Sequence, residues 1–421
     1  MNFHAFMMRV SLLAAGVASA TALAADQTLT IRDVPVPGLV SFQPDKPLNR
    51  TTPLVLDDST RTIPVQFDMD RMWWYQPESC DARGRTYTLQ ARKTGEADEA
   101  GVRIQEKEGV LEVTIDGRPF TAFNYAKDLP KPFLYPVIGP TGAAVTRHYP
   151  MKEVASEPAK RRDHPHHRSI WTAHGDVRTT DFSKPGTDYW AEDKPGTEKP
   201  SKGLQKVARI VRVHGGPVFG LIEADIDWIT PAGKKELSET RTCIFYKTPD
   251  DQRIIDVKVV LKFTESDVMF ADTKEGGILS LRVATSMDEI GGGKMVNARG
   301  QTGMNECWGQ PAEWCDYVGP VDGRTVGIAV FDGPTNLRHP TRWHIRNYGL
   351  YTANPFMAGA VTREQKKKDP NVKLLDESRT WKKGEKAEFN YRILIHTGDT
   401  RAAKIAEQYK LYAQPAKVTL N

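Results

Sequence analysis

The sequence has few cysteines and none of the short motifs that mark common cofactor sites. Its 421 residues include four cysteines, too few for a scaffold held together by disulfides. There is no Gly-Lys-Ser/Thr phosphate loop, no Gly-x-Gly-x-x-Gly after a strand, no His-Glu-x-x-His and no Cys-x-x-Cys. These absences disfavour a nucleotide-dependent enzyme and the best-known zinc sites. The spacing of Cys307 and Cys315 is compatible with a disulfide and, equally, with two buried thiols.

Strong net charge and long apolar runs are also missing. The formal net charge is +5 and the charged residues, 26% of the chain, are well mixed, which disfavours nucleic-acid binding and wholesale disorder. Arg9 precedes an apolar run over residues 10–20, and Ala22-Leu23-Ala24 fits a cleavage site. We therefore predict a signal peptide at residues 1–24 and a periplasmic or secreted protein. No later apolar run reaches the roughly 18 residues of a membrane span.

Apolar and polar residues alternate along much of the chain, as in half-buried β-strands. Residues 110–115 alternate and are followed by Asp116-Gly117, a favoured hairpin turn. Residues 222–228, 255–263 and 389–395 alternate in the same way. One helix is predicted near the C-terminus, where Asp399 precedes an apolar stripe over residues 402–412. The pattern predicts an all-β protein built as a sandwich.

Composition divides the chain into two predicted β domains. Gly, Ala, Asp and Glu replace the strand pattern at residues 94–101. We predict a small Ig-like β-sandwich at residues 26–98, with Trp73, Trp74 and Tyr75 at its centre. A large two-sheet sandwich would follow at residues 102–415. Residues 179–202 are rich in Pro, Gly, Lys and Asp and are predicted to form a long loop, a kind of segment that is often functional.

Five of the ten histidines lie between positions 148 and 174. The densest part reads Asp163-His164-Pro165-His166-His167-Arg168-Ser169 and continues to Trp171 and His174-Gly175-Asp176. Pro165 disfavours a helix at the residue before it, so we expect an extended segment. In that geometry His164 and His166 point to one side and His167 to the other.

Clustered imidazoles suit proton transfer, because histidine titrates near neutral pH. Asp163 or Asp176 would orient a ring by accepting its N–H, and Arg168 would hold a carboxylate or an oxyanion. His164 and His166 together would also suit a divalent metal. The plainer interpretation is a polar loop whose histidines cap backbone groups. We favour a site because sites gather several titratable groups.

A second dense segment covers residues 336–349, which hold two His, three Arg, Trp343 and Tyr348. Glu275 precedes a predicted strand and would be a general base in a pocket that raised its pKa. Trp308 and Asp316 lie in a segment whose aromatic rings and carboxylates suit sugar binding. As alternatives, Trp343 and Tyr348 would be core aromatics, and Glu275 a solvated turn residue.

Together these residues resemble a bacterial family of unknown function labelled methane oxygenase PmoA-like, over about residues 102–415. The most specific segment is 163–169 with Trp171 and residues 174–176. Residues 274–276, 314–317 and 339–341 also match, as do Asn336, Trp343, His344, Arg346, Tyr348 and Gly349. At the level of fold, the large β domain with clustered His and a Glu at a strand mouth is similar to the galactose-mutarotase supersandwich. That resemblance implies a sugar-active enzyme that uses His and Glu or Tyr as acid and base.

Three functions follow from these observations. The first is an exported carbohydrate-active enzyme, an epimerase, lyase or hydrolase, acting on a monosaccharide or oligosaccharide. The second is a divalent-metal enzyme, and the third a non-catalytic glycan-binding protein. All depend on the two dense segments lining one cavity. The predicted catalytic residues are His166, His167, Arg168, His174, Glu275 and His344. The predicted substrate-binding residues are Asp163, His164, Trp171, Asp176, Trp308, Asp316, Asn336, His339, Trp343, Arg346 and Tyr348. The candidate metal ligands are His164 and His166.

Overall fold

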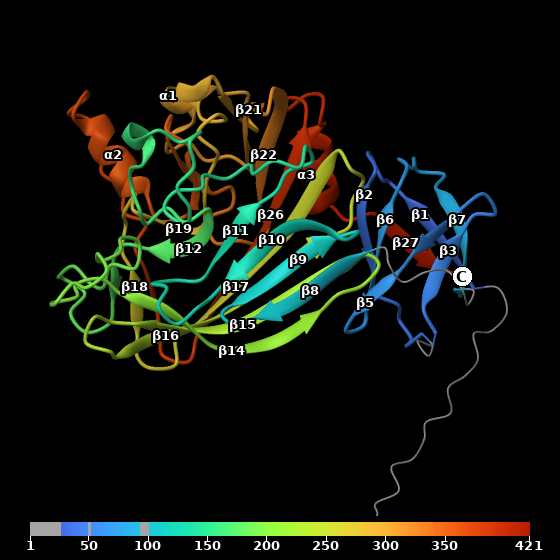
Figure 1. The fold of residues 1–421 in the computed structure, drawn as a ribbon, viewed down its shortest axis with the longest axis horizontal. Helices are drawn as coiled ribbons and strands as arrows, with labels where there is room; N and C mark the ends of the chain where they lie inside the picture. Colours follow the sequence, from blue (N-terminus) through green and yellow to red (C-terminus); the bar gives the residue numbers. More distant parts are fainter. Residues whose placement is uncertain (1–26, 49–51, 93–100) are drawn as a thin grey trace, which may run out of the picture.

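The computed structural model describes residues 27–48, 52–92 and 101–421, which form a chain dominated by antiparallel strands (Figure 1). Strands account for 47% of the structure and helices for 8%, so the predicted all-β sandwich class is confirmed. The predicted signal peptide at residues 1–24 lies outside the described residues, as does most of the predicted boundary at residues 94–101.

Two eight-stranded sheets and one three-stranded sheet make up the larger part of the molecule. In spatial order the first sheet contains β23 (Arg342–Ile345), β24 (Leu350–Asn354), β19 (Gly276–Arg282), β12 (Ile170–His174), β11 (Phe133–Val137), β10 (Arg118–Asn124), β9 (Val110–Ile115) and β8 (Val102–Lys107). The second contains β14 (Leu204–His214), β15 (Phe219–Ile229), β16 (Lys235–Tyr246), β17 (Gln252–Lys262), β26 (Lys386–Thr397), β22 (Arg324–Asp332), β21 (Trp314–Val321) and β20 (Lys294–Asn297). The short sheet contains β13 (Val177–Arg178), β18 (Val268–Phe270) and β25 (Arg379–Trp381).

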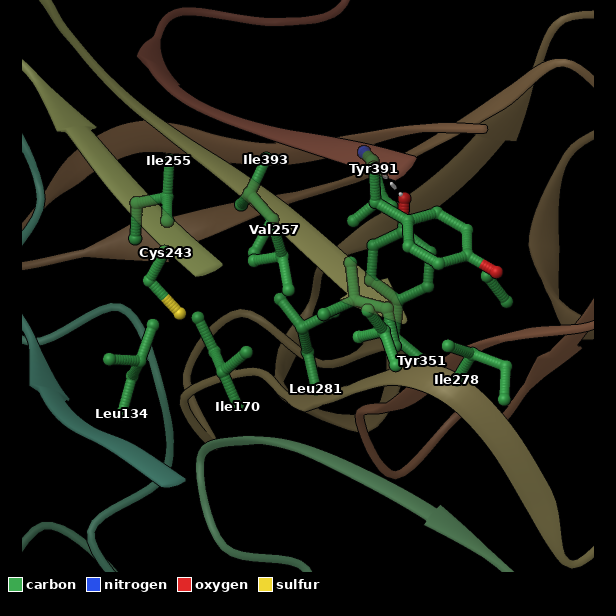
Figure 2. Packing of buried hydrophobic residues seen from close by; sticks show 14 of the residues in the cluster. Leu134, Ile170, Cys243, Ile255, Val257, Ile278, Leu281, Tyr351, Tyr391 and Ile393 are labelled. Carbon is green, nitrogen blue, oxygen red and sulfur yellow. Dashed lines mark hydrogen bonds between the residues drawn. The ribbon is translucent and has the colours of Figure 1, made fainter. Parts of the chain in front are cut away.

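The main hydrophobic core lies between the two large sheets. Figure 2 shows Ile170 and Leu281 of the first sheet packed near Val257 and Ile393 of the second. All four side chains are at most 3% exposed, and burying a side chain of this size contributes roughly 1.5–3 kcal/mol. Successive residues of a strand point to opposite faces, so the strands of the first sheet carry a second set of side chains on its outer face.

A smaller unit is formed by two further sheets, on the right of Figure 1. Strand β6 (Arg71–Gln76) alternates between intermediate and buried positions along its length, and Trp74 is fully buried in the core of this unit. The neighbours of Trp74 face the other way: Trp73 packs edge-on against Phe219, and the Tyr75 hydroxyl contacts Gln252. Of the three aromatics predicted at the centre of this unit, Trp74 alone lies in its core. The sheets are β27 (Lys417–Leu420), β1 (Thr28–Arg32), β7 (Arg85–Ala91), β3 (Leu54–Asp57) and β4 (Thr62–Pro64), then β2 (Gly38–Phe42), β6 (Arg71–Gln76) and β5 (Gln66–Asp68).

The predicted C-terminal helix is α3 (Ile405–Ala413). Asp399 does not cap it directly; its carboxylate accepts the N–H groups of Arg401 and Ala402 in the turn before the helix. Two helices were not predicted, α1 (Gly303–Cys307) and α2 (Ala358–Lys366). Every helix in the described ranges is too short or too polar to cross a membrane.

All four cysteines are free thiols in this structure. The disulfide considered between Cys307 and Cys315 is therefore absent. Both side chains are fully buried, and the thiol of Cys307 donates to the carbonyl of Gln301 over 3.4 Å. Of the two alternatives that the spacing left open, the structure has the pair of buried thiols.

Candidate functional site

The histidine-rich segment forms a tight turn at the start of β12. The backbone N–H of His167 donates to the carbonyl of His164 over 3.0 Å, and His164 has a φ of 46°. Pro165 takes the second position of this turn, which its fixed φ favours. The extended conformation predicted for residues 164–167 is therefore wrong: proline removed the helical alternative, but the chain reverses instead of continuing.

The turn brings three imidazoles together. The rings of His164 and His167 stack at 4.8 Å with an interplanar angle of 5°. His166 meets His167 edge-on at 4.5 Å. His164 and His167 thus share one stack and His166 lies beside it. The prediction that His164 and His166 point to the same side is therefore wrong. Tyr348 extends the stack beyond His164 at 5.1 Å, and Trp171 extends it beyond His167 at 5.3 Å.

A buried ionic network fixes this turn. One carboxylate oxygen of Asp163 accepts hydrogen bonds from Arg147 and Arg282, each at 2.7 Å. Burial favours protonation of Asp163, but the hydrogen bond with His164 and the two guanidinium charges outweigh it and hold its pKa well below the usual range. Arg147 also donates to the carbonyl groups of Asp163 and His164. Asp163, predicted to bind substrate, is therefore an anchor for the loop.

Arg282 also fixes the state of His167. Its guanidinium donates to Nδ1 of His167 over 3.0 Å, which assigns the ring proton to Nε2. Burial, followed by the charges of His166 and Arg282, holds the pKa of His167 well below its usual value. The side chain is 1% exposed, so this neutral ring supports the turn and is out of reach of a substrate. The predicted catalytic role of His167 is corrected accordingly.

The sheet order brings the second dense segment to the same place. Strands β12, β19, β24 and β23 are consecutive antiparallel neighbours, so the loop before β12 and the loop after β23 lie at the same end of the sheet. Glu275, at the mouth of β19, interacts electrostatically with both His166 and His344. Residues far apart in sequence are thus neighbours at this site: His164 stacks on Tyr348, and Glu275 lies within electrostatic reach of imidazoles from both segments.

Glu275 is an ionised carboxylate. Burial would raise the pKa of Glu275, but the hydrogen bond from Lys274 and the interaction with His344 outweigh it and keep the pKa below its usual value. The side chain is 44% exposed and so is open to a ligand. Burial and the charges of Lys131 and His164 lower the pKa of His166 to about 4, which leaves that ring neutral near pH 7.

His344 holds its neighbours in place. Its Nδ1 contacts the carbonyl of Lys274, and its Nε2 accepts a hydrogen bond from Nε of Arg346 over 3.2 Å. Burial lowers the pKa of His344 to about 4. Because both ring nitrogens are engaged and the side chain is buried, His344 positions Lys274 and Arg346, and its predicted role in proton exchange with a substrate is corrected.

A cavity of about 470 Å³ opens beside this group. Helix α2 forms one wall through Val361, Glu364 and neighbouring side chains, and Trp308 and Arg346 form another. The guanidinium of Arg346 lies over the Trp308 ring at 5.4 Å. None of the residues of the 164–174 segment lines this cavity, so the imidazoles lie beside it rather than inside it.

Two tryptophans predicted to bind substrate are buried instead. Trp171 is 1% exposed and packs against His167 and Trp190. Trp343 is fully buried and donates its indole N–H to the carbonyl of Ala312. Of the three tryptophans predicted to bind substrate, only Trp308 lines the cavity. The alternation of apolar and polar residues in the sequence does not distinguish a buried tryptophan from an exposed one, because both occupy apolar positions in the pattern.

Three further predictions on the first segment are corrected. His174 is fully buried, stacked on Phe270 at 4.7 Å, and its Nε2 contacts the carbonyl of Ala271. The Asp176 carboxylate is held by Arg178 and by the N–H of Gly186. The guanidinium of Arg168 forms a bidentate pair with Glu192 at 2.8–3.0 Å, which occupies the group expected to bind an oxyanion.

Three residues predicted to bind substrate belong to polar networks elsewhere. Asp316 is buried and accepts hydrogen bonds from His396 and Thr400. Asn336 and His339 both bond to Asp332 at 2.7 and 2.8 Å. The latter two order the loop between β22 and β23. They are therefore structural groups and not part of the candidate site.

The candidate metal ligands His164 and His166 do not belong to a larger set of described side chains arranged around a metal. Their rings meet edge-on at 5.7 Å, and Nδ1 of His164 faces Asp163 at 3.1 Å. Within residues 27–48, 52–92 and 101–421, no group of three or more His, Cys, Asp or Glu side chains is arranged to hold a metal ion. The described ligands thus do not form a metal site.

Sequence reasoning missed three contributors. Trp190, from the long loop, packs edge-on against His166 and His167 at 6.1 and 5.5 Å. An aromatic residue inside a segment otherwise rich in Pro, Gly and Lys was the signal available for it. Arg147 and Arg282 gave no signal, because each is isolated in sequence from the carboxylate that it binds.

Fold and site define an all-β sandwich with a polar site on the outer face of one sheet. The chain belongs to a family described as "Family of unknown function (DUF6807)", which matches residues 110–410. That description names no activity, and the methane oxygenase PmoA-like label stays a prediction. No curated protein matches the sequence.

Two solved structures overlap distantly with the chain. A protein in the glycosyl hydrolase family 38 from Enterococcus faecalis matches with 10% identity and a TM-score of 0.41, covering 94% of this chain and 47% of that one. The chain therefore spans about half of that protein's length. A GalM/aldose epimerase homologue from C. elegans matches with 8% identity and a TM-score of 0.30, covering 71% of this chain and 99% of that one. Overlaps this low assign no activity.

Proposed function

We propose that the protein is a carbohydrate-active enzyme that moves a proton on a sugar at the group formed by Glu275 and His166. The observation that carries this proposal is the ionised, half-exposed carboxylate of Glu275 within electrostatic reach of a neutral imidazole. A carboxylate and an imidazole can exchange one proton with a substrate, and such a positioned pair contributes about 10²–10⁴-fold to a rate.

The neighbouring cavity suits a sugar. The face of Trp308 offers an apolar surface, and Arg346, Asn305 and Gln310 offer hydrogen-bond donors and acceptors beside it. In the proposed reaction the Glu275 carboxylate takes a proton from a sugar carbon or hydroxyl. The protonated Glu275 then returns this proton to the substrate or its leaving oxygen, while the neutral His166 ring hydrogen-bonds the substrate oxygen. Lys274, paired with Glu275, balances the charge that develops.

Epimerisation, elimination and hydrolysis all begin with such a transfer, and they leave different products. The protein would be incubated with a panel of monosaccharides and oligosaccharides in deuterated water and, separately, in heavy-oxygen water, and followed by mass spectrometry. An epimerase exchanges a carbon-bound hydrogen for deuterium, a lyase releases an unsaturated sugar, and a hydrolase incorporates heavy oxygen. Each outcome names one reaction.

The variant Glu275→Gln keeps the shape of the side chain and removes the base. We expect it to lose 10²-fold or more in turnover. Glu407→Gln, on the exposed surface of α3, is the matched control and should leave turnover unchanged. If sugars bind, return unchanged and bind equally well to Glu275→Gln, the protein is a glycan-binding protein and the enzymatic proposal is wrong.

We also propose export to the periplasm or beyond the cell, on the basis of residues 1–24. Processing would be checked by N-terminal sequencing of protein purified from its native host. A mature chain that begins after Ala24 supports export, and an intact Met1 in the cell interior contradicts it.

A further inference from the structure

Arg346 lines the cavity with most of its hydrogen-bonding capacity unused. Its Nε donates to His344, which fixes the plane of the guanidinium above Trp308. Its two Nη groups make no hydrogen bond, and the side chain no ion pair, within the described ranges. A guanidinium that lies over an aromatic ring, with both terminal nitrogens available, matches the planar geometry of a carboxylate or the oxygens of a sulfate.

The charges around the cavity are not balanced locally. Lys274, Arg346 and Lys368 line it together with one carboxylate, that of Glu364. Glu364 is turned to Lys367, with both oxygens within 2.8–2.9 Å of its ammonium. Lys274 pairs with Glu275, while Lys368, like Arg346, has no carboxylate partner in the part of the chain that the structure describes. Two cations therefore face the cavity without a direct ion pair in the described residues, although Glu364 lies within electrostatic reach of Arg346.

We propose that the sugar bound in this cavity carries an anionic group, a carboxylate or a sulfate, that is held by Arg346 with support from Lys368. This inference rests on the proposed function and names its substrate class. The acidic group would take the position above α2, and the ring would lie against Trp308. The remainder of the sugar would then extend toward Glu275 and His166. Charge complementarity of this kind selects acidic sugars over neutral ones.

Binding of three sets of oligosaccharides of equal length would test this, with neutral, uronate-containing and sulfated members. Isothermal titration calorimetry at low salt should show acidic members binding at least about tenfold more tightly than neutral ones. Hydrogen bonds to charged groups have this strength or more. Comparison of the uronate and sulfate sets identifies which acidic group the site takes. Added salt should reduce the difference.

The variant Arg346→Gln should weaken binding of acidic members by about ten- to a hundredfold and binding of neutral members far less, because glutamine still hydrogen-bonds a hydroxyl group. Arg346→Lys, which keeps the charge without the planar fork, should fall between. Arg324→Gln removes an exposed arginine that does not line the cavity, and it should change nothing. Should Arg346→Gln fail to fold, the exposed Lys368→Gln carries the test, with a loss of several-fold expected for acidic members.

The outcomes separate the two proposals. If neutral oligosaccharides bind as tightly as acidic ones, or if Arg346→Gln and Lys368→Gln both bind acidic members normally, the anionic substrate class is wrong. The proposed enzymatic function then survives. If no member of any set binds or is converted, the proposed function is wrong, and the proposed substrate class is wrong as well.

Discussion

Replacing Asp163 with asparagine would leave the guanidinium groups of Arg147 and Arg282 without their shared carboxylate. These side chains are 0% and 1% exposed, so water cannot replace the lost charge. Removing one partner of a buried ion pair costs about 3–5 kcal/mol. The Asp163 side chain is 39% exposed, which allows solvent to screen part of the interaction, and asparagine still accepts one hydrogen bond. We therefore expect the low end, about 3 kcal/mol of unfolding free energy.

Urea unfolding followed by tryptophan fluorescence would measure this loss. Asp181→Asn is the matched control, because Asp181 also pairs with a cation in a loop, but on the surface. It should leave the unfolding free energy unchanged within error. A loss below about 1 kcal/mol for Asp163→Asn would refute the account of this network as a buried, uncompensated pair of charges.

The remaining predictions concern pH and thiols. Burial lowers the pKa of His174 and of His344 to about 4. Between pH 6.5 and 4 the unfolded chain therefore binds protons that the folded chain does not, and unfolding free energy should fall as pH drops, by about 1.4 kcal/mol per pH unit for each histidine. Urea unfolding at stepped pH checks this, and equal stability at pH 6.5 and 5 would contradict it. The hydrogen bond to Asp332 raises the pKa of His339, so protonated His339 stabilises the fold below pH 6.5, and this stabilisation is lost as pH rises through the folded pKa. In His339→Asn, the unfolding free energy should therefore fall less steeply over that pH range. Alkylation of the native protein, read by mass spectrometry, should label Cys80 first, because the other three thiols are at most 2% exposed. A disulfide-linked peptide from Cys307 and Cys315 would be the contrary result.

The larger β-strands could be predicted because their pattern is local. Residues 110–115 form β9 with the predicted bounds, and the Asp116-Gly117 turn has positive φ at both residues. Helix α2 was missed for a physical reason. Its N-terminal N–H groups are bound by Asp272 and Glu377, far away in sequence, instead of by a local capping residue.

The two segments rich in His and Arg correctly predicted which parts of the chain lie together at the site, but not which of their side chains are exposed to solvent. The dense segments at residues 163–174 and 336–349 meet at His164 and Tyr348. Which histidine reaches solvent depends on which face of the sheet each residue takes, and the turn at Pro165 sets this for the first segment. A prediction that placed this segment as an extended strand necessarily assigned the rings to the wrong sides.

The pairing of β27 with β1 has a consequence for biosynthesis. Leu29 lies opposite Leu420, so the last strand of the chain completes a sheet begun by the first. During translation, the edge of β1 that pairs with β27 remains unpaired until the whole large sandwich has been synthesised. An unpaired edge of that kind invites association with other nascent chains. Premature termination shortly before Lys417 would therefore leave the edge of β1 that pairs with β27 exposed and prone to aggregation.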